Sequence, residues 1–228
     1  MPRSPDRIRR FSSGQRAIHA TLGTLMGVCI LTAAMLYWGP LSTLVGRRDL
    51  VETVHFTSGL LLPLPLVIGA LASRAFRADV RRLNRFLPGD GRWLRARDRR
   101  GGAYPSGKFN AGQKLNSAFV LGSVIVLFAT GLMLHYFTLF PDDISTGATF
   151  VHDAFAAAVV IVSAGHLWMA WQDAEARRGL RTGFVSREWA EREHALWAAP
   201  VPTVPAPAPA PGADGPGRPS GGDSEPPG

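Results

Sequence analysis

Hydrophobic residues along this chain gather into four long stretches, and charged residues lie between them. The stretches cover about residues 18–38, 50–72, 115–137 and 149–172. Each is long enough to cross about 30 Å of hydrocarbon as a helix. The first and third contain no Asp, Glu, Lys or Arg, and the others hold one acid each, Glu52 and Asp153. The pattern predicts an all-α fold, a four-helix transmembrane bundle.

Basic residues predict which side of the membrane each connection occupies. Arginines are dense before the first stretch, between the second and third, and after the fourth, whereas the two short connections hold only Arg47 and Arg48. By the positive-inside rule, both termini and the long middle loop are cytoplasmic. The net charge of +8 then reflects membrane topology, and we expect no nucleic acid partner.

The composition divides the chain into four parts. We expect a cytoplasmic N-terminal segment at 1–17, the membrane domain at 18–172, a cytoplasmic amphipathic segment at 173–199 and a disordered tail at 200–228, which is rich in Pro, Ala and Gly. The middle loop is either a short amphipathic surface helix or a solvated connection. No internal repeat is evident. A single cysteine, Cys29, excludes a cysteine-ligated cluster built from this chain alone.

Four histidines lie within the hydrophobic stretches. The topology places His55 and His152 near the outer side, and His19 and His166 near the cytoplasmic side. His152 and His166 are fourteen residues apart, so one helix carries them about 21 Å apart along one face. Histidine is an axial ligand of haem iron. The pattern predicts two stacked haems, an outer one between His55 and His152 and an inner one between His19 and His166.

Other interpretations of these histidines remain open. A lone histidine in a membrane helix often bonds to a neighbouring helix. Glycines that follow on the same faces, at Gly23, Gly27 and Gly59, either admit a flat macrocycle or form a helix-packing surface. His135 lies at the depth of the outer pair and could replace one ligand, although we favour a non-ligand role. His194 follows the last span and is expected to take no part.

A polar motif directly precedes the third stretch. Lys108 and Lys114, the only lysines of the chain, flank Asn110 and Gln113. These two amides could donate hydrogen bonds to a quinone head near the inner haem. Alternatively, Asn110 caps the helix and Gln113 completes a capping box.

Further segments complete a family pattern. They are residues 10–12 with 16–19, 73–79 and 146–153. Together with residues 108–114, they resemble the cytochrome b (gamma) subunit of membrane-bound formate dehydrogenase over about residues 8–197. The resemblance implies two haem b groups, held by His55 with His152 and by His19 with His166. It also implies a quinone, menaquinone or ubiquinone, at Asn110 and Gln113.

The resemblance further implies an electron-transfer subunit of the bacterial cytoplasmic (inner) membrane with no substrate-oxidising site of its own. Electrons would come from an iron-sulfur subunit on the outer face, next to a catalytic formate dehydrogenase subunit, and pass to quinone near the cytoplasm. Arg47, Arg48, Asp142 and Asp143 are candidates for docking that partner. The alternatives are a cytochrome b of nickel-iron hydrogenase or thiosulfate reductase, or a non-haem transporter or anchor.

Overall fold

The computed structural model describes residues 6–97 and 104–199 and confirms the expected helical membrane fold. It contains four spans long and apolar enough to cross a membrane. They are α1 (Ser13–Tyr37), α3 (Arg48–Leu61) continued by α4 (Leu64–Ala72), α7 (Ala111–His135) and α8 (Asp142–Trp171). The tail predicted to be disordered, residues 200–228, lies outside the described residues.

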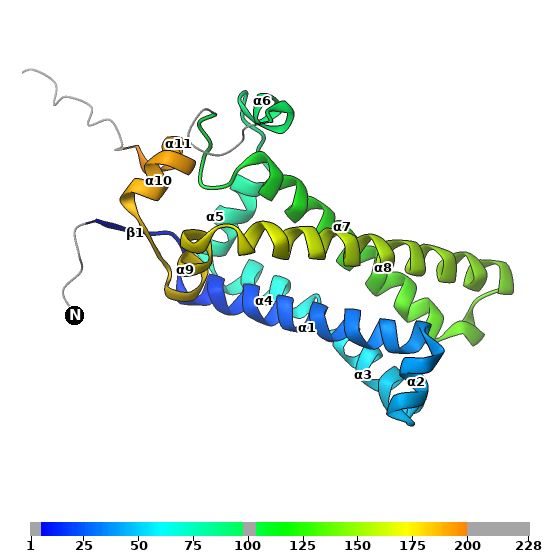
Figure 1. The fold of residues 1–228 in the computed structure, drawn as a ribbon. Helices are drawn as coiled ribbons and strands as arrows, with labels where there is room; N and C mark the ends of the chain where they lie inside the picture. Colours follow the sequence, from blue (N-terminus) through cyan, green and yellow to red (C-terminus); the bar gives the residue numbers. More distant parts are fainter. Residues whose placement is uncertain (1–5, 98–103, 200–228) are drawn as a thin grey trace, which may run out of the picture.

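The spans form two helical hairpins. The first hairpin is α1 with α3 and α4, joined by α2 (Gly39–Val45), and the second is α7 with α8, joined by the 3-10 helix η1 (Phe137–Leu139). Helices pack closely within each hairpin, and contacts between the hairpins are sparser. Figure 1 shows α2 on the right, at what we call the hairpin end, and the short polar elements on the left, at the polar end.

Three spans begin earlier than the hydrophobic pattern predicts, so the predicted starts at 18, 115 and 149 were too late. Ser12 accepts from Gln15 N and the Gln15 side chain accepts from Ser12 N, which completes a capping box before α1. Asn110 begins α7 in the same way. For α8, Asp142 and Asp143 stabilise the first turn through the helix dipole. Hydropathy alone misses these polar first turns.

The second span is interrupted, although its sequence predicts one continuous helix. Pro63 has no N–H to donate to Gly59, and Leu62 N instead bonds Gly59 O at 3.3 Å. Residues 62 and 63 nevertheless keep right-handed helical backbone angles, so the chain continues in the same direction into α4. Proline therefore interrupts the helical hydrogen bonds of this span without ending it.

The polar end holds the remaining short elements. A two-stranded antiparallel ribbon pairs Ile8 with Val185, and a small core forms around Val185, Trp189 and Ala190. The ribbon ties the segment before α1 to the segment after α8. The elements are β1 (Arg7–Arg9), α5 (Arg74–Leu83), α6 (Asp90–Arg95), α9 (Ala174–Thr182), β2 (Phe184–Ser186), α10 (Arg187–Glu193) and α11 (Ala195–Ala198).

The two hairpins share one design, which corrects the expectation that the chain holds no internal repeat. Residues 11–16 read Phe-Ser-Ser-Gly-Gln-Arg and residues 109–114 read Phe-Asn-Ala-Gly-Gln-Lys. Each segment opens a helix of 25 residues through a capping box. The helix interiors differ in sequence because positions facing lipid require only apolar side chains. The repeat therefore becomes evident only when equivalent helices are compared.

The hairpins also end alike. Each second helix is followed by a short helix with a side-chain N-cap, and an arginine of that short helix reaches back to the last turn of the span. Arg77 bonds the carbonyls of Ala70 and Leu71, and Arg177 bonds those of Ala170 and Trp171. These bonds satisfy carbonyls that a helix C-terminus leaves without partners.

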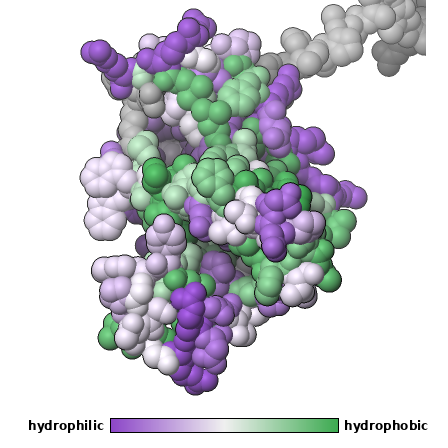
Figure 2. Space-filling model, turned by 90° about the vertical axis from the view of Figure 1, so that its right-hand side faces the viewer, coloured by the Kyte–Doolittle hydropathy of each residue, from purple (hydrophilic) through white to green (hydrophobic). Residues whose placement is uncertain are grey.

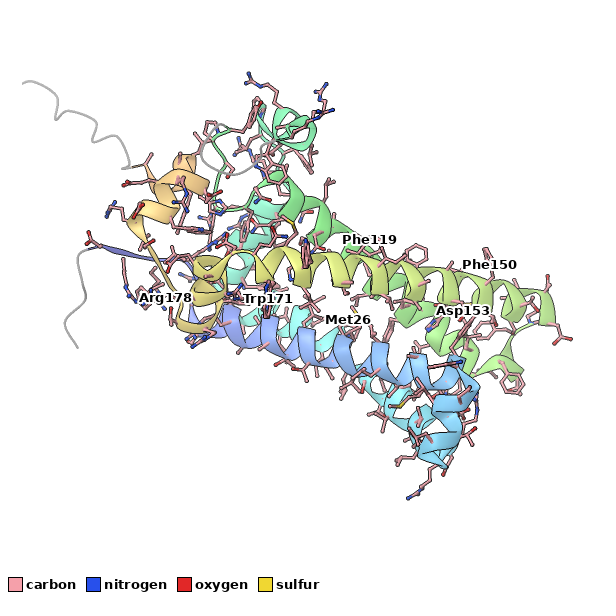
Figure 3. The ribbon with its side chains drawn as sticks, in the orientation of Figure 1. Met26, Phe119, Phe150, Asp153, Trp171 and Arg178 are labelled. Atoms are coloured by element: carbon pink, nitrogen blue, oxygen red, sulfur yellow. The ribbon has the colours of Figure 1, made fainter. Side chains whose placement is uncertain are left out.

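The outer faces of the spans are hydrophobic, as expected for contact with lipid. Leu31, Ile125 and Ile161 are all more than 60% exposed. Phe150 points away from the other helices, and Trp171 lies at the end of α8 (Figure 3). From the hairpin end, Figure 2 shows hydrophobic residues exposed beside hydrophilic ones. Exposed tryptophans at a span end are typical of a membrane interface.

Candidate functional site between the hairpins

Both predicted histidine pairs lie together in the structure, and each pair joins the two hairpins. His55 of α3 and His152 of α8 form the hairpin-end pair, with ring centroids 6.3 Å apart. His19 of α1 and His166 of α8 form the polar-end pair, also with ring centroids 6.3 Å apart. Since the hairpins contact each other sparsely, the pairs lie where helix packing is least close.

The spacing of each pair fits a metal held between two imidazoles. A first-row metal lies about 2.0 Å from an imidazole nitrogen, which lies about 1.1 Å from the ring centre, so opposed ligands place their centroids about 6.2 Å apart. Both observed separations match this value. Within the described residues, no group of three or more His, Cys, Asp or Glu side chains converges as a metal site. Two axial histidines therefore fit haem better than zinc.

The pairs occupy two levels of the bundle. The fourteen residues between His152 and His166 correspond to about 21 Å along α8. On α1, Thr32 reaches His55 at the hairpin-end level, thirteen residues beyond His19. Thirteen residues correspond to about 20 Å, so the two helices give similar separations between the levels.

Two threonines that the sequence interpretation missed contact the hairpin-end pair. Thr32 Oγ1 lies 2.9 Å from His55 Nδ1, and Thr130 Oγ1 lies 2.9 Å from His152 Nδ1. Gly131, next to Thr130, lies so close to His152 that a Cβ there would meet the ring Cε1 at 3.4 Å. In the sequence, these contacts are indicated only by the matching positions of the two threonines, each of which lies 20 residues after the cap residue of its helix.

The polar-end pair has different surroundings. Within the described part of the chain, no hydrogen bond reaches the ring of His19 or His166. A Cβ added to Gly23 or Gly27, which follow His19 on the same face, would meet nothing within 4 Å. Open space beside these glycines fits a flat macrocycle and disagrees with a packed small-residue surface within this chain.

His135 lies near the hairpin-end pair but its ring is engaged elsewhere. It stacks on Phe56, with centroids 3.7 Å apart and planes inclined by 13°, and packs edge-on against Tyr136. Phe56 is the neighbour of His55 in sequence and points to another face of α3. This arrangement agrees with the non-ligand interpretation of His135.

The polar motif forms the capping box considered as the alternative interpretation. Asn110 Oδ1 accepts from Gln113 N at 2.9 Å, and Gln113 Oε1 accepts from Asn110 N at 3.0 Å. These bonds use the amide oxygens of both side chains. The amide NH₂ groups have no protein partner within the described residues, and both side chains are half-buried. Capping and donation to a ligand are therefore compatible.

The two lysines of the motif form buried ion pairs. Lys108 Nζ lies 2.5 Å from Asp79 of α5, and Lys114 Nζ lies 2.6 Å from Asp90 of α6. All four side chains are at most 8% exposed. Burial lowers the pKa of Lys108, and the Asp79 carboxylate partly offsets this. The lysines thus attach the middle loop to the start of α7.

His194 is not part of either pair, and its buried ring instead joins segments of the polar end. The ring is 2% exposed, and it bonds Gly107 O through Nδ1 at 2.7 Å and the Arg10 guanidinium through Nε2 at 3.1 Å. Burial, with the Arg10 charge, lowers the pKa of His194 to about 3. A neutral ring with its proton on Nδ1 makes both bonds. His194 therefore connects the last helices with the loop before α7.

A polar cavity of about 480 Å³ adjoins this network. It lies between the start of α1 and α5, and its lining includes Phe11, Gln15, Asp79 and Lys108. Its volume is within the range typical of small-molecule sites.

Comparison with known proteins identifies the family. The model of the prokaryotic cytochrome b561 family matches residues 10–180, which include all four spans and both histidine pairs. The chain belongs to the prokaryotic cytochrome b561 family. This cytochrome is accordingly a multi-pass membrane protein that binds haem b and transfers electrons.

Individual relatives carry a more specific name. The formate dehydrogenase, nitrate-inducible, cytochrome b556(Fdn) subunit of Escherichia coli strain K12 is 29% identical over 94 residues, which are 40% of this chain and 43% of the relative. Proteins of the same name from Escherichia coli O157:H7 and Shigella flexneri match equally. The aligned region thus spans less than half of these relatives. The similarity to cytochrome b subunits of formate dehydrogenase, expected from sequence motifs, is confirmed.

Proposed function

We propose that this cytochrome is the membrane-anchoring dihaem subunit of a formate dehydrogenase complex, which passes electrons from an iron-sulfur subunit to quinone. The observation that carries the proposal is the two histidine pairs, each spaced 6.3 Å and each bridging the hairpins. The formate dehydrogenase partner is supported by the names of the relatives. When bound, haem b supplies one-electron redox chemistry.

The residues of this chain hold and orient the cofactors. His55 with His152 would hold one haem, and His19 with His166 the other. The arginines of the polar end favour a cytoplasmic location for both termini, in a bacterial inner membrane. The hairpin-end haem then lies near the outer face, and the polar-end haem lies near the cytoplasm.

The quinone site is proposed at the polar end. The free amide NH₂ groups of Asn110 and Gln113 can donate hydrogen bonds to a quinone carbonyl without opening the capping box. The polar cavity near Lys108 offers water access for proton uptake. Menaquinone and ubiquinone present the same carbonyl chemistry to these donors.

The iron-sulfur and catalytic subunits are proposed to dock at the hairpin end, and membrane lipid surrounds the spans. Arg47, Asp142 and Asp143 are exposed there, and Arg48 pairs with Glu52 on the same surface. The docking surface carries both positive and negative side chains. Such a pattern helps to orient a partner with complementary charges more than it attracts the partner by net charge. Formate oxidation takes place in the partner.

The experiment that tests ligation removes one histidine of the polar-end pair. His166→Ala should abolish one b haem and leave the hairpin-end haem reducible, as read by redox difference spectroscopy of the purified protein. His135→Ala is the matched control, since its ring stacks on Phe56, and it should retain both haems. Two reducible b haems in His166→Ala would refute the assignment.

A separate experiment tests the partner. The cytochrome purified with its native complex should become reduced when formate is added, and the iron-sulfur subunit should copurify. Reduction by hydrogen or by a sulfur compound, with no response to formate, would instead assign the chain to a hydrogenase or thiosulfate reductase complex. Absence of any b-type spectrum would favour a transporter or anchor.

A further inference from the structure

We propose that Thr32 and Thr130 are positioning residues that fix the tautomer and the ligand strength of His55 and His152. The inference rests on the proposed haem ligation and adds a role for two residues that do not touch the metal. Each hydroxyl lies 2.9 Å from an imidazole Nδ1. The hairpin-end ligands would thereby be held in one orientation.

The direction of each hydrogen bond follows from the helix backbone. Thr32 Oγ1 donates its one proton to Val28 O at 2.7 Å, and Thr130 Oγ1 donates to Val126 O at 2.8 Å. A hydroxyl has a single proton and two acceptor lone pairs. With that proton directed to the carbonyl, each oxygen accepts from the imidazole, so Nδ1 carries the proton. The lone pair of Nε2 is left free to bind a metal.

Burial favours this assignment. Thr32 and Thr130 are each 8% exposed. With the ring proton on Nε2, either the hydroxyl gives up its bond to the carbonyl to donate to Nδ1, or Nδ1 stays without a partner, which costs about 1–3 kcal/mol for a buried group. The threonines thus stabilise the protonation state that ligation requires.

The internal repeat supports the inference independently. Thr32 and Thr130 occupy the same position in α1 and α7, each 20 residues after the cap residue. His55 and His152 lie in the second helix of each hairpin, 23 and 22 residues after these threonines. The same Thr–His contact therefore occurs twice, once in each half, although the surrounding helices differ in sequence.

The contact has an electronic consequence. An acceptor on the second ring nitrogen raises the basicity of a ligating histidine. A more basic ligand stabilises the oxidised iron and lowers the reduction potential of the haem. Within the described residues the polar-end pair lacks such bonds, so only the hairpin-end haem should respond to the threonines.

The test replaces the hydroxyls and keeps the shape. In the holoprotein, Thr32→Val, Thr130→Val and the double variant should raise the midpoint potential of the hairpin-end haem and leave the polar-end haem unchanged. For a one-electron couple, a tenfold change in the equilibrium constant between oxidised and reduced haem shifts the midpoint potential by about 59 mV. Thr→Ser at either position retains the hydroxyl and should restore the wild-type potential. Optical redox titration and electron paramagnetic resonance measure both haems.

Thr149→Val is the matched control. Thr149 also bonds a carbonyl one turn back, Ser145 O, but it is exposed and contacts no histidine, so both potentials should stay at wild-type values. Valine variants that lose the hairpin-end haem while the serine variants retain it would also support the inference. Unchanged potentials and spectra in the double valine variant, with both haems bound, would overturn it.

One further variant separates an error in the role of the threonines from an error in the proposed haem ligation. His55→Ala should lose the hairpin-end haem. If it does and the valine variants behave as wild type, only the role of the threonines is wrong. If His55→Ala keeps both haems, the proposed ligation itself is wrong.

Discussion

Asp79 holds the polar end together, and its replacement by asparagine gives the sharpest test of the fold. The carboxylate is 6% exposed and accepts from three side chains. Lys108 Nζ and Gln15 Nε2 each lie 2.5 Å from Oδ2, and Arg82 Nη1 lies 2.8 Å from Oδ1. Asp79 thus links α5 to the capping box of α1 and to the loop before α7.

The expected cost follows from the burial of the partners. Lys108 and Asp79 side chains are 7% and 8% exposed, and removing one partner of a buried ion pair costs about 3–5 kcal/mol. Arg82 is 54% exposed, and exposed ion pairs contribute about 0–1 kcal/mol. Asp79→Asn should therefore destabilise strongly, and Arg82→Gln should behave almost as wild type.

Thermal unfolding of the detergent-solubilised holoprotein measures the effect. A loss of about 3–5 kcal/mol lowers Tm by roughly 10 °C for a chain of this size. The double variant Asp79→Asn with Lys108→Met removes the uncompensated charge and should recover part of the loss, since an apolar replacement of a buried pair is often neutral. An Asp79→Asn protein as stable as Arg82→Gln would refute the reasoning, as would a double variant less stable than the single one.

Two further predictions concern the same end. Because burial lowers the pKa of His194 to about 3 from the usual 6.5, the unfolded chain binds the proton first, and stability should fall by up to about 5 kcal/mol as pH drops from 6.5 towards 3. Near-UV circular dichroism of Trp189 should report this loss, because its ring centroid lies 4.9 Å from that of His194. His194→Gln should make stability less dependent on pH. Equal dependence of stability on pH in the wild type and the variant would contradict this prediction. Gly183→Ala should lower Tm more than Gly46→Ala, although both glycines have positive φ. A Cβ at Gly183 would lie 2.7 Å from Phe11 O, whereas a Cβ at Gly46 would meet nothing within 4 Å. Equal shifts in Tm would count against the steric argument.

The spans and the histidine pairs were predictable because both depend on position along a helix. Hydrophobic length gives the spans, and residue counting along them gives the two levels at which His19, His55, His152 and His166 lie; the side of the membrane stays a prediction from the arginines. The structure brings together the same two pairs. Only the polar first turns and the interruption at Pro63 departed from this pattern, because hydropathy does not report caps or missing N–H groups.

Contacts between distant segments could not be predicted in the same way. Lys108 and Lys114 were interpreted as neighbours of a quinone, yet their charges pair with Asp79 and Asp90, which lie in the middle loop. The identity of such partners depends on how short helices fold back onto the bundle. Thr32 is a similar case, because its contact with a histidine depends on the rotation of α1 about its own axis.

The internal repeat explains why the two levels are built differently. At the hairpin end, each half supplies one histidine from its second helix and one threonine from its first, so the level has matched ligands and matched threonines. A repeated polar-end level would need a histidine fourteen residues after His55, where the chain has Gly69.

A histidine at position 69 would require neighbouring side chains to move. A Cβ there would lie 2.7 Å from Ile18 Cδ1 and 2.9 Å from Phe76 Cδ1, because α4 packs tightly on α1 at this level. The first hairpin instead supplies its polar-end histidine from its other helix, where His19, the neighbour of Ile18 on α1, lies within reach of His166. The two levels therefore have different surroundings, so the two proposed haems should differ in potential.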